Sequence, residues 1–254
     1  MNPVFDLENR VVIVTGGAAG IGREYCVGLT RAGASVVIAD LDGPRALQTA
    51  ETLPNALGVR CDVADETSVG AAVDAAIARF GRIDGLVNNA ALMSALPRGA
   101  WRDIEVSDWD RVMAVNLRGL FLCCRAVYPH MARQGGGKIV NISSNRVFDG
   151  TPNRLHYSTS KAGVIGFTRS LAREVGDDNI CVNAVTPGYT ASEGQLGTSS
   201  PEYVQQMAAL NARKALKRTQ VPGDIVGAVL FLIAPASDYI SGQTLNVDGG
   251  FVMH

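Results

Sequence analysis

The sequence is poor in the residues that bind metals or form disulfides. It has three histidines in 254 residues, and their spacing fits no metal-ligand motif. An odd number of cysteines without a C-x-x-C pair indicates reduced thiols in a cytoplasmic protein rather than a disulfide framework. These cysteines are Cys26, Cys61, Cys123, Cys124 and Cys181. We therefore expect no metal site and a cytoplasmic location.

The sequence also lacks an excess of charge of either sign. Its 23 basic and 24 acidic residues leave a formal net charge of -1. This balance favours neither nucleic acid nor an anionic membrane as a partner. The short apolar run near the N-terminus ends in a glycine turn, so it predicts neither a membrane span nor a signal peptide. We expect the partner to be a small molecule.

No linker rich in proline, glycine or serine divides the chain, and short β-branched runs alternate with longer helical stretches. The runs are RVVIVTGG, SVVIADLD, ALGVRCDV, IDGLVNNA, GKIVNISS, NICVNAVTPG and QTLNVDGG. Runs that are apolar on both faces belong in a sheet that is covered on both sides. The pattern predicts a single α/β domain over residues 1–254, with a doubly wound, mostly parallel sheet of about seven strands and helices on both faces.

The stretch DETSVGAAVDAAIARFG is one of the helical segments. Asp65 is a candidate N-cap and Gly81 a candidate stop, so the pattern predicts a helix between them. The region at about residues 190–215 departs from the alternation, because a small, polar stretch precedes its helical part. We interpret it as a mobile substrate insertion over a site, with a plain surface connection as the alternative.

A glycine-rich turn, TGGAAGIG at residues 15–22, follows the first predicted strand and opens a helix that includes Ile21. Gly16, Gly20 and Gly22 have no Cβ, so the backbone can turn sharply and approach a pyrophosphate closely. The free N–H groups and the positive dipole end of the helix would bind the anionic oxygens. No G-K-[ST] follows, so a kinase or ATPase phosphate loop is unsupported. The turn predicts a nucleotide site, with a simple tight turn as the alternative.

The second predicted strand ends in Asp40. A carboxylate there would accept hydrogen bonds from the ribose hydroxyls of the adenosine and repel a 2′-phosphate. Ala19 and Leu41 stand where a basic residue would contact that phosphate, so NAD is favoured over NADP. Asp62 and Val63, at the end of the third predicted strand, would meet the adenine. An ordinary turn role for Asp40 is the alternative.

Residues 156–161 read HYSTSK and fit two different enzymes. Ser158 and Lys161 match S-x-x-K, the nucleophile motif of penicillin-binding proteins. Tyr157 and Lys161 would instead place a phenol and an ammonium one helical turn apart, as a proton-transferring pair. The S-D-N and K-T-G motifs that accompany S-x-x-K are absent from the chain, and that reading gives the glycine turn no function. The tyrosine reading is therefore favoured.

With this glycine turn, NNAA at 88–91 and YSTSK at 157–161, the chain resembles the short-chain dehydrogenase/reductase family in its compact, single-domain form. The resemblance covers essentially the whole chain. The glycine motif, Asn116, the serine of NISS, the Y-x-x-x-K pair and the Pro-Gly of TPGYT occur in the family's order and spacing. It implies a Rossmann fold, a nicotinamide cofactor and oxidoreduction between an alcohol and a carbonyl group.

The resemblance implies a role for each matching residue. Tyr157 would be the general acid/base, and Ser144 would hold the substrate oxygen, whereas Ser143 fails the spacing. Lys161 would bind the nicotinamide ribose, and Asn116 would link Lys161 through water to solvent. Further cofactor contacts would come from Asn89, Ala90, Pro187, Gly188, Thr190 and Ser192. The chain departs from the family where NNAA replaces the usual NNAG, and where Thr190 and Ser192 replace the usual Ile and Thr.

Oxidation of an alcohol by hydride transfer also requires the hydroxyl proton to leave. Free tyrosine has a pKa near ~10, and lowering it to about 7 requires roughly 4 kcal/mol in favour of the phenolate. Lys161 and the positive nicotinamide ring of bound NAD would supply this stabilisation at short range. Ser144 would orient the substrate oxygen and stabilise its alkoxide character.

The motifs do not name the substrate, and loops at the carboxyl ends of the strands supply the pocket candidates. These are Met93, Ser94, Leu96, Arg146, Phe148, Asn153, Arg154, His156, Tyr189 and residues 193–215. For Arg146 and Arg154 we favour a solvated surface position. The stretches SNRVFDGTPN and GQTLNVDGGFVMH resemble those of dehydrogenases of ring-bearing alcohols, such as pyridoxal 4-dehydrogenase and the phenylethanol dehydrogenases. That resemblance implies a secondary or cyclic alcohol as substrate.

Two alternative functions are kept. The alternative within the family is a 3-oxoacyl-[acyl-carrier-protein] reductase. Asp40 argues against this alternative, because fatty-acid synthesis usually uses NADPH. The alternative from another class is a non-catalytic NAD-binding protein. The resemblance further implies a homotetramer, with the helices around 107–134 and 157–176 forming one interface.

Overall fold

Seven strands form one sheet in the order β3-β2-β1-β4-β5-β6-β7, and each pairs in parallel with its neighbours. The computed structural model describes residues 5–93, 96, 98–191 and 200–253. The strands are β1 (Val11–Thr15), β2 (Ser35–Asp40), β3 (Ala56–Arg60), β4 (Gly85–Asn88), β5 (Gly137–Ile142), β6 (Ile180–Pro187) and β7 (Thr244–Val247). Each predicted run contains one of these strands, so the predicted fold class is confirmed.

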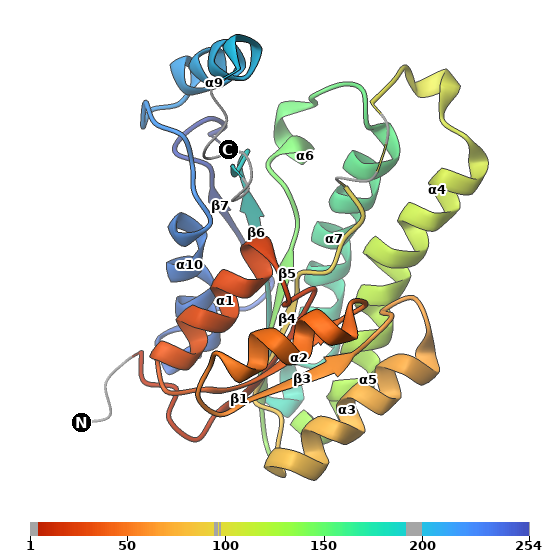
Figure 1. The fold of residues 1–254 in the computed structure, drawn as a ribbon. Helices are drawn as coiled ribbons and strands as arrows, with labels where there is room; N and C mark the ends of the chain where they lie inside the picture. The colour runs from red at the N-terminus through yellow and green to blue at the C-terminus, as the bar shows by residue number, and fades with distance from the viewer. Residues whose placement is uncertain (1–4, 94–95, 97, 192–199, 254) are drawn as a thin grey trace.

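Helices cover both faces of the sheet, because alternate side chains of each strand enter opposite layers. In β1, Val11 and Ile13 belong to one apolar core, whereas Val12 and Val14 belong to the other. Figure 1 shows the two helical layers. One contains α1 (Gly20–Arg31), α2 (Gly43–Glu51) and α10 (Gly223–Ile233); the other contains α3 (Glu66–Phe80), α5 (Gly119–Arg133) and α7 (Leu155–Glu174).

The helix predicted between Asp65 and Gly81 is α3, and both of its ends follow local chemistry. The Asp65 carboxylate accepts a hydrogen bond from the Thr67 N–H at 3.0 Å and so caps the first turn. Gly81 closes the helix in the left-handed conformation, at φ +77°. The prediction is confirmed at both ends.

The chain changes direction across the sheet between β1 and β4, which are adjacent although two strands separate them in sequence. In an open parallel sheet, ligands bind at the carboxyl ends of the strands beside such a reversal. Several short elements lie at this edge: α6 (Arg146–Asp149) follows β5, and α9 (Pro201–Arg213) lies beyond the ends of β6 and β7 (Figure 1). An Arg213–Asp149 ion pair of 2.8 Å joins these two helices.

Several short helical elements complete the fold. After α4 (Val106–Met113), one turn of π-helix, η2 (Ala114–Arg118), leads directly into α5. Short 3₁₀ turns occur at η1 (Trp101–Asp103), η3 (Gly176–Asp178) and η4 (Pro235–Ser237). A single π-helical turn within an α-helical run is frequent at functional sites. This turn contains Asn116.

The region that departs from the strand–helix alternation, at about residues 190–215, is described at residues 190–191 and from residue 200 onward. Its second part forms α9, as the sequence pattern predicts, and residues 192–199 lie outside the described residues. Ser192 and the first part of the predicted insertion are among them. In the described part of the chain, none of the helices is both long and apolar enough to cross a membrane.

Candidate active site

The glycine-rich turn after β1 forms an open cradle at the start of α1. Gly16 and Gly20 have positive φ angles of +63° and +53°, which L side chains rarely adopt. A Cβ on Gly22 would lie 2.0 Å from the carbonyl oxygen of Gly16, so the helix start packs directly on the turn. The N-cap residue, Ala19, offers no side-chain cap, so the first N–H groups of α1 remain for a ligand. This cradle fits a pyrophosphate.

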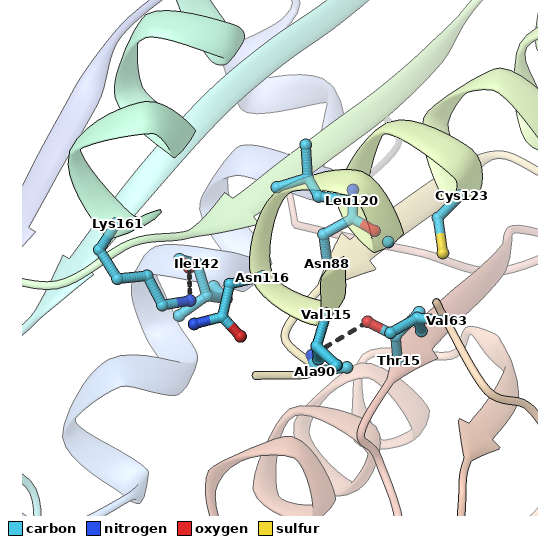
Figure 2. Close-up of a pocket in the computed structure, with 11 residues that line it drawn as sticks. Thr15, Val63, Asn88, Ala90, Val115, Asn116, Leu120, Cys123, Ile142 and Lys161 are labelled. Carbon is cyan, nitrogen blue, oxygen red and sulfur yellow. Dashed lines mark hydrogen bonds between the residues drawn. The ribbon is translucent and has the colours of Figure 1, made fainter. Parts of the chain in front are cut away.

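Residues that follow β4 hold the cradle in place. The side-chain amide of Asn89 donates to the carbonyl oxygens of Thr15, at 2.9 Å, and Gly16, at 3.0 Å. The Thr15 hydroxyl in turn accepts hydrogen bonds from the backbone N–H groups of Asn89 and Ala90. Figure 2 shows the bond from Ala90. Asn89 and Ala90 lie just beyond the end of β4 rather than on it. Asn89 therefore fixes the shape of the glycine turn.

Asp40 lies at the carboxyl end of β2, against the same turn. One carboxylate oxygen accepts from the backbone N–H of Ala18 at 3.0 Å, and the other accepts from Asp42 at 3.1 Å. A carboxylate has about four acceptor positions, so two remain for other donors such as ribose hydroxyls. The neighbouring Leu41 side chain is 60% exposed and carries no charge. The surroundings of Asp40 suit an uncharged ribose.

Asp62 and Val63 follow β3 and behave differently from each other. The Asp62 carboxylate accepts from the Ala64 N–H at 2.9 Å and so shapes its own turn. Val63 is buried, and a Cβ on Gly119 would lie 2.9 Å from its side chain. Val63 thus packs on the first residue of α5. It lines a small cavity there together with Thr15, Asn88, Ala90, Val115, Asn116, Leu120, Cys123, Ile142 and Lys161 (Figure 2).

The two serines after β5 have separate partners. The Ser144 side chain is a neighbour of the Tyr157 phenol, which is 6% exposed, and as a hydrogen-bonding group it lowers the pKa of that phenol. The Ser143 hydroxyl instead donates to the backbone carbonyl of Lys161 at 2.7 Å. Ser143 thereby anchors α7 to the end of β5, whereas Ser144 points toward the phenol.

Lys161 is buried beneath Tyr157. Its amine donates to the carbonyl of Ile142 at 2.7 Å and lies 5.8 Å from the centre of the Tyr157 ring. Burial lowers the pKa of this amine from 10.5 to about 8. Asn116 lines the same cavity, held by a bond from the Leu92 N–H at 2.8 Å and by its own bond to the Ser160 hydroxyl at 3.0 Å (Figure 2). The π-helical turn thus presents Asn116 beside the amine.

The charges around the phenol differ from those expected. Burial raises the pKa of Tyr157 above 10, whereas the bond to Ser144 and the positive charges of Arg146 and Arg154 lower it. The amine of Lys161 donates a hydrogen bond to the carbonyl of Ile142 rather than to the phenol. In the protein alone the phenol therefore stays protonated at neutral pH, and two arginines supply the nearby charge for which the sequence indicated only Lys161.

The expectation that Arg146 and Arg154 are solvated surface residues is wrong. Both side chains are half-buried, because each donates to backbone carbonyls of the loops around the site. Arg146 bonds to Thr151 at 2.7 Å, and Arg154 bonds to Leu96 at 3.3 Å. A signal was present in the sequence, since both arginines lie within three residues of Ser144 or Tyr157.

The other pocket candidates fall into three groups. Leu96 is buried with Val112 against Tyr157, and His156 is buried in the first turn of α7. Met93, Phe148, Asn153 and Tyr189 are exposed or half-buried at the carboxyl edge of the sheet. Ser94 lies outside the described residues.

The segment after β6 closes the other side of the site. The Gly188 N–H donates to the Val247 carbonyl at 3.0 Å, and a Cβ on Gly188 would lie 2.7 Å from Asp248. The Pro187 carbonyl accepts from the Asn145 N–H at 3.0 Å, next to Ser144. Thr190 forms an isolated bridge with Gln220. Pro187, Gly188 and Thr190 are therefore held at the same edge of the sheet as Ser144.

Comparisons with known proteins agree with this geometry. A family model described as enoyl-(acyl carrier protein) reductase matches residues 16–252. A Rhizobium meliloti (strain 1021) protein named "Probable galactose dehydrogenase GalD" is 40% identical over 250 residues, with 96% of each chain covered. The (2S)-[(R)-hydroxy(phenyl)methyl]succinyl-CoA dehydrogenase subunit BbsD of Thauera aromatica is 39% identical over 248 residues, covering 96% of this chain and 97% of its own.

A solved structure from Sinorhizobium meliloti 1021, which bears the name of a short-chain alcohol dehydrogenase, superposes with a TM-score of 0.90. It is 32% identical in sequence and covers 98% of both chains. The chain belongs to the short-chain dehydrogenase/reductase family. It is accordingly an oxidoreductase of alcohol and carbonyl groups that uses a nicotinamide cofactor, and the penicillin-binding reading of S-x-x-K is wrong.

Proposed function

We propose that the protein is an NAD-dependent dehydrogenase of a secondary or cyclic alcohol, with Tyr157 as its general acid/base. The observation that carries this proposal is the convergence of two groups on the buried Tyr157 phenol: the Ser144 side chain, which lowers the pKa of the phenol, and the buried amine of Lys161, 5.8 Å from the ring centre. All three lie at the same edge of the sheet as the glycine cradle of α1. Bound NAD supplies the hydride acceptor for the oxidation.

The residues of the chain would handle the substrate oxygen and its proton. Ser144 holds the oxygen in hydrogen-bonding reach of the Tyr157 phenol, which removes the proton during oxidation and returns it during reduction. Lys161 binds the nicotinamide ribose and adds positive charge below the phenol. Asn116, held by Leu92 and Ser160, links this amine through water to solvent.

The preference for NAD rests on Asp40. Its carboxylate lies beside the cradle, where it would accept the ribose hydroxyls and repel a 2′-phosphate. Asp62 and Val63 would contact the adenine, and Pro187, Gly188, Thr190 and Ser192 would contact the nicotinamide. Asp40 also argues against the alternative of a carrier-protein reductase that runs on NADPH.

The substrate class is supported by the names of the relatives. One is named for galactose, and the other for a hydroxy(phenyl)methyl succinyl-CoA, so both names describe an alcohol attached to or part of a ring. The buried leucine at position 96 gives the site an apolar wall beside the phenol. A homotetramer is part of the proposal, with the helices around 107–134 and 157–176 in one interface, and light scattering that shows only monomer would contradict it.

The test is an absorbance screen at 340 nm with NAD and a panel of cyclic, aromatic and sugar alcohols. We expect NADH formation with at least one alcohol, and a loss of about 10³-fold or more in kcat for Tyr157→Phe with NADH affinity nearly unchanged. Loss of NADH affinity in that variant would make the tyrosine structural. NADH binding without turnover of any alcohol would favour the non-catalytic alternative.

A further inference from the structure

Two arginines flank the Ser144–Tyr157 pair, and they come from different elements. Arg146 is the first residue of α6, two positions after Ser144. Arg154 is the N-cap residue of α7, three positions before Tyr157. Their charges reach the phenol as well as each other. Both arginines therefore belong to the chain segment between Ser144 and Tyr157, and both charges act on the phenol.

Backbone carbonyls fix both guanidinium groups without using all of their donors. Arg146 donates from Nη2 to the carbonyls of Thr151 and Pro152, at 2.7 and 2.8 Å, and from Nε to the Ser158 hydroxyl at 3.4 Å. Its Nη1 has no acceptor among the described residues. The five N–H donors of a planar guanidinium suit a carboxylate or phosphate. Because the Arg146 guanidinium is fixed in place and its Nη1 is unused, it is preformed for contact with an anion.

Arg154 has a buried donor that lacks a hydrogen-bond partner among the described residues. It donates from Nη2 to the Leu96 carbonyl at 3.3 Å, whereas its buried Nε has no hydrogen-bond partner among the residues that the structure describes. A buried donor without a partner costs free energy, more so when the group is charged. A bound acceptor would remove this cost.

The positive charge of the pair is not neutralised by the described part of the chain. Neither Arg146 nor Arg154 forms an ion pair with any described carboxylate. The carboxylate that acts on Arg146, Asp149, already accepts from Arg213 and from Thr151. A third cation, Arg98, repels both guanidinium groups. The site thus has several like charges in a half-buried setting, which an anion would stabilise.

We propose that the substrate is an anionic alcohol, a hydroxy acid whose carboxylate binds between Arg146 and Arg154 while its hydroxyl binds Ser144 and Tyr157. This assignment deepens the proposed function and rests on it. The carboxylate would use the free Nη1 edge of Arg146 and the buried Nε of Arg154. Two anchors on the substrate would fix the reacting carbon against the phenol.

A different role for the arginines predicts a different result. If they served only to lower the pKa of Tyr157, their loss would slow every alcohol equally and shift the pH profile upward. If they bind the substrate anion, their loss acts on acids and spares the matched neutral compounds. Matched pairs that differ only in this charge separate the two roles.

The kinetic test uses acid and amide pairs with NAD at 340 nm: 3-hydroxybutyrate and 3-hydroxybutyramide, mandelate and mandelamide, gluconate and gluconamide. We expect kcat/KM for the acid of the accepted pair to exceed that of its amide at least about tenfold. Arg146→Met and Arg154→Met should each lower the acid's value roughly 10- to 100-fold and the amide's less than about threefold. Arg102→Met is the control, since that side chain is 73% exposed and its charge is not among those that act on the phenol.

Equal turnover of acid and amide, or an equal loss for both in the arginine variants, would overturn the proposal. Glycerol 3-phosphate is included, and a preference for it over the acids would replace the carboxylate by a phosphate. If an arginine-to-methionine variant fails to fold, two measurements still test the proposal. They are the acid-to-amide ratio of kcat/KM for the unmodified protein and the same ratio for Arg146→Lys and Arg154→Lys.

A binding measurement separates failure of this inference from failure of the proposed function. Calorimetric titrations of malonate and malonamide are made on the unmodified protein, with and without NADH. We expect malonate to bind at least about tenfold more tightly than malonamide, and both arginine variants to abolish the difference. Absence of a difference overturns the anion site, whatever the alcohol screen shows; a difference with a silent alcohol screen retains the anion site and overturns the dehydrogenase.

Discussion

The Ser144 side chain acts on the Tyr157 phenol as a hydrogen-bonding neighbour that lowers its pKa, although thirteen positions separate the two residues, one just after β5 and the other in α7. The neighbouring Ser143 bonds instead to the backbone carbonyl of Lys161, at 2.7 Å. Two adjacent serines therefore face different structures, because successive residues at a strand end point to opposite sides. One serine serves the site, and the other connects β5 to α7.

Substitution of the two serines should have opposite consequences. Ser144→Ala removes the group that holds the substrate oxygen and should lower kcat about 10²- to 10³-fold. Ser143→Ala should retain most of the activity but destabilise the protein by about 1 kcal/mol, because a buried hydrogen bond is lost. Steady-state kinetics and thermal unfolding check both. Equal kinetic effects of the two substitutions would contradict the assignment.

Lys161→Met should abolish turnover without loss of stability. Burial lowers the amine's pKa from 10.5 to about 8, so the folded state bears a penalty of roughly 3 kcal/mol for the charged form at neutral pH. The substitution removes this penalty, although the Ile142 carbonyl loses its donor at a cost of about 1–3 kcal/mol. The melting temperature should stay equal or rise by a few degrees at pH 7.

The penalty at Lys161 has a defined pH window. The free-energy penalty for burying the charged amine is present in full below about pH 8. It disappears as the pH rises toward 10.5, where the amine of the unfolded chain also loses its proton. Any gain in Lys161→Met should therefore be larger at pH 7 than at pH 10. The exposed Lys217→Met is the matched control and should change neither property. A fall of more than a few degrees in Lys161→Met would make the amine a structural anchor.

The fold could be predicted from the sequence because its signals are local. The apolar runs identify all seven strands, and Asp65 and Gly81 mark the ends of α3 through hydrogen bonds within one turn. The glycine turn is equally local, since Gly16 and Gly20 need only a positive φ. Parallel pairing then follows from the helical crossovers.

Other features depend on contacts between distant segments and could not be predicted in the same way. Asn89 holds the glycine turn across 73 positions, and Asn116 bonds to Ser160 across 44. The sequence favours a solvated position for Arg146 and Arg154, because charged residues in a polar loop are usually exposed. Their half-buried positions arise from hydrogen bonds to backbone carbonyls of neighbouring loops, and no periodicity in the sequence indicates such bonds.

Asp40→Ala should change the choice of cofactor. Without the carboxylate, a 2′-phosphate is no longer repelled, so the ratio of kcat/KM for NAD to that for NADP should fall at least about tenfold. Asp42→Ala is a suitable control, because Asp42 caps α2 through the Arg45 N–H at 3.1 Å. It should cost about 1 kcal/mol of stability and leave the cofactor ratio unchanged. An unchanged ratio in Asp40→Ala would remove Asp40 from the cofactor site.

The buried thiols should make the protein lose stability above pH 9. Burial raises the pKa of Cys61 to about 11 and those of Cys26 and Cys124 to about 12, from 9.0, and raises that of Cys123 as well. Between pH 9 and 11 the unfolded chain loses these protons and the folded chain keeps them, so the free energy of unfolding falls as pH rises.

The lysine in the site opposes this trend, but one amine cannot balance four thiols. Each thiol contributes a slope of up to about -1.4 kcal/mol per pH unit, and Lys161 contributes one of the opposite sign up to pH 10.5. The free energy of unfolding should fall by about 3 kcal/mol between pH 9 and pH 10. Urea denaturation under a phosphine reductant measures it, and Cys124→Ala should reduce the fall by about a third. A stability that stays level over this range would mean that the thiols are accessible to water in the folded protein.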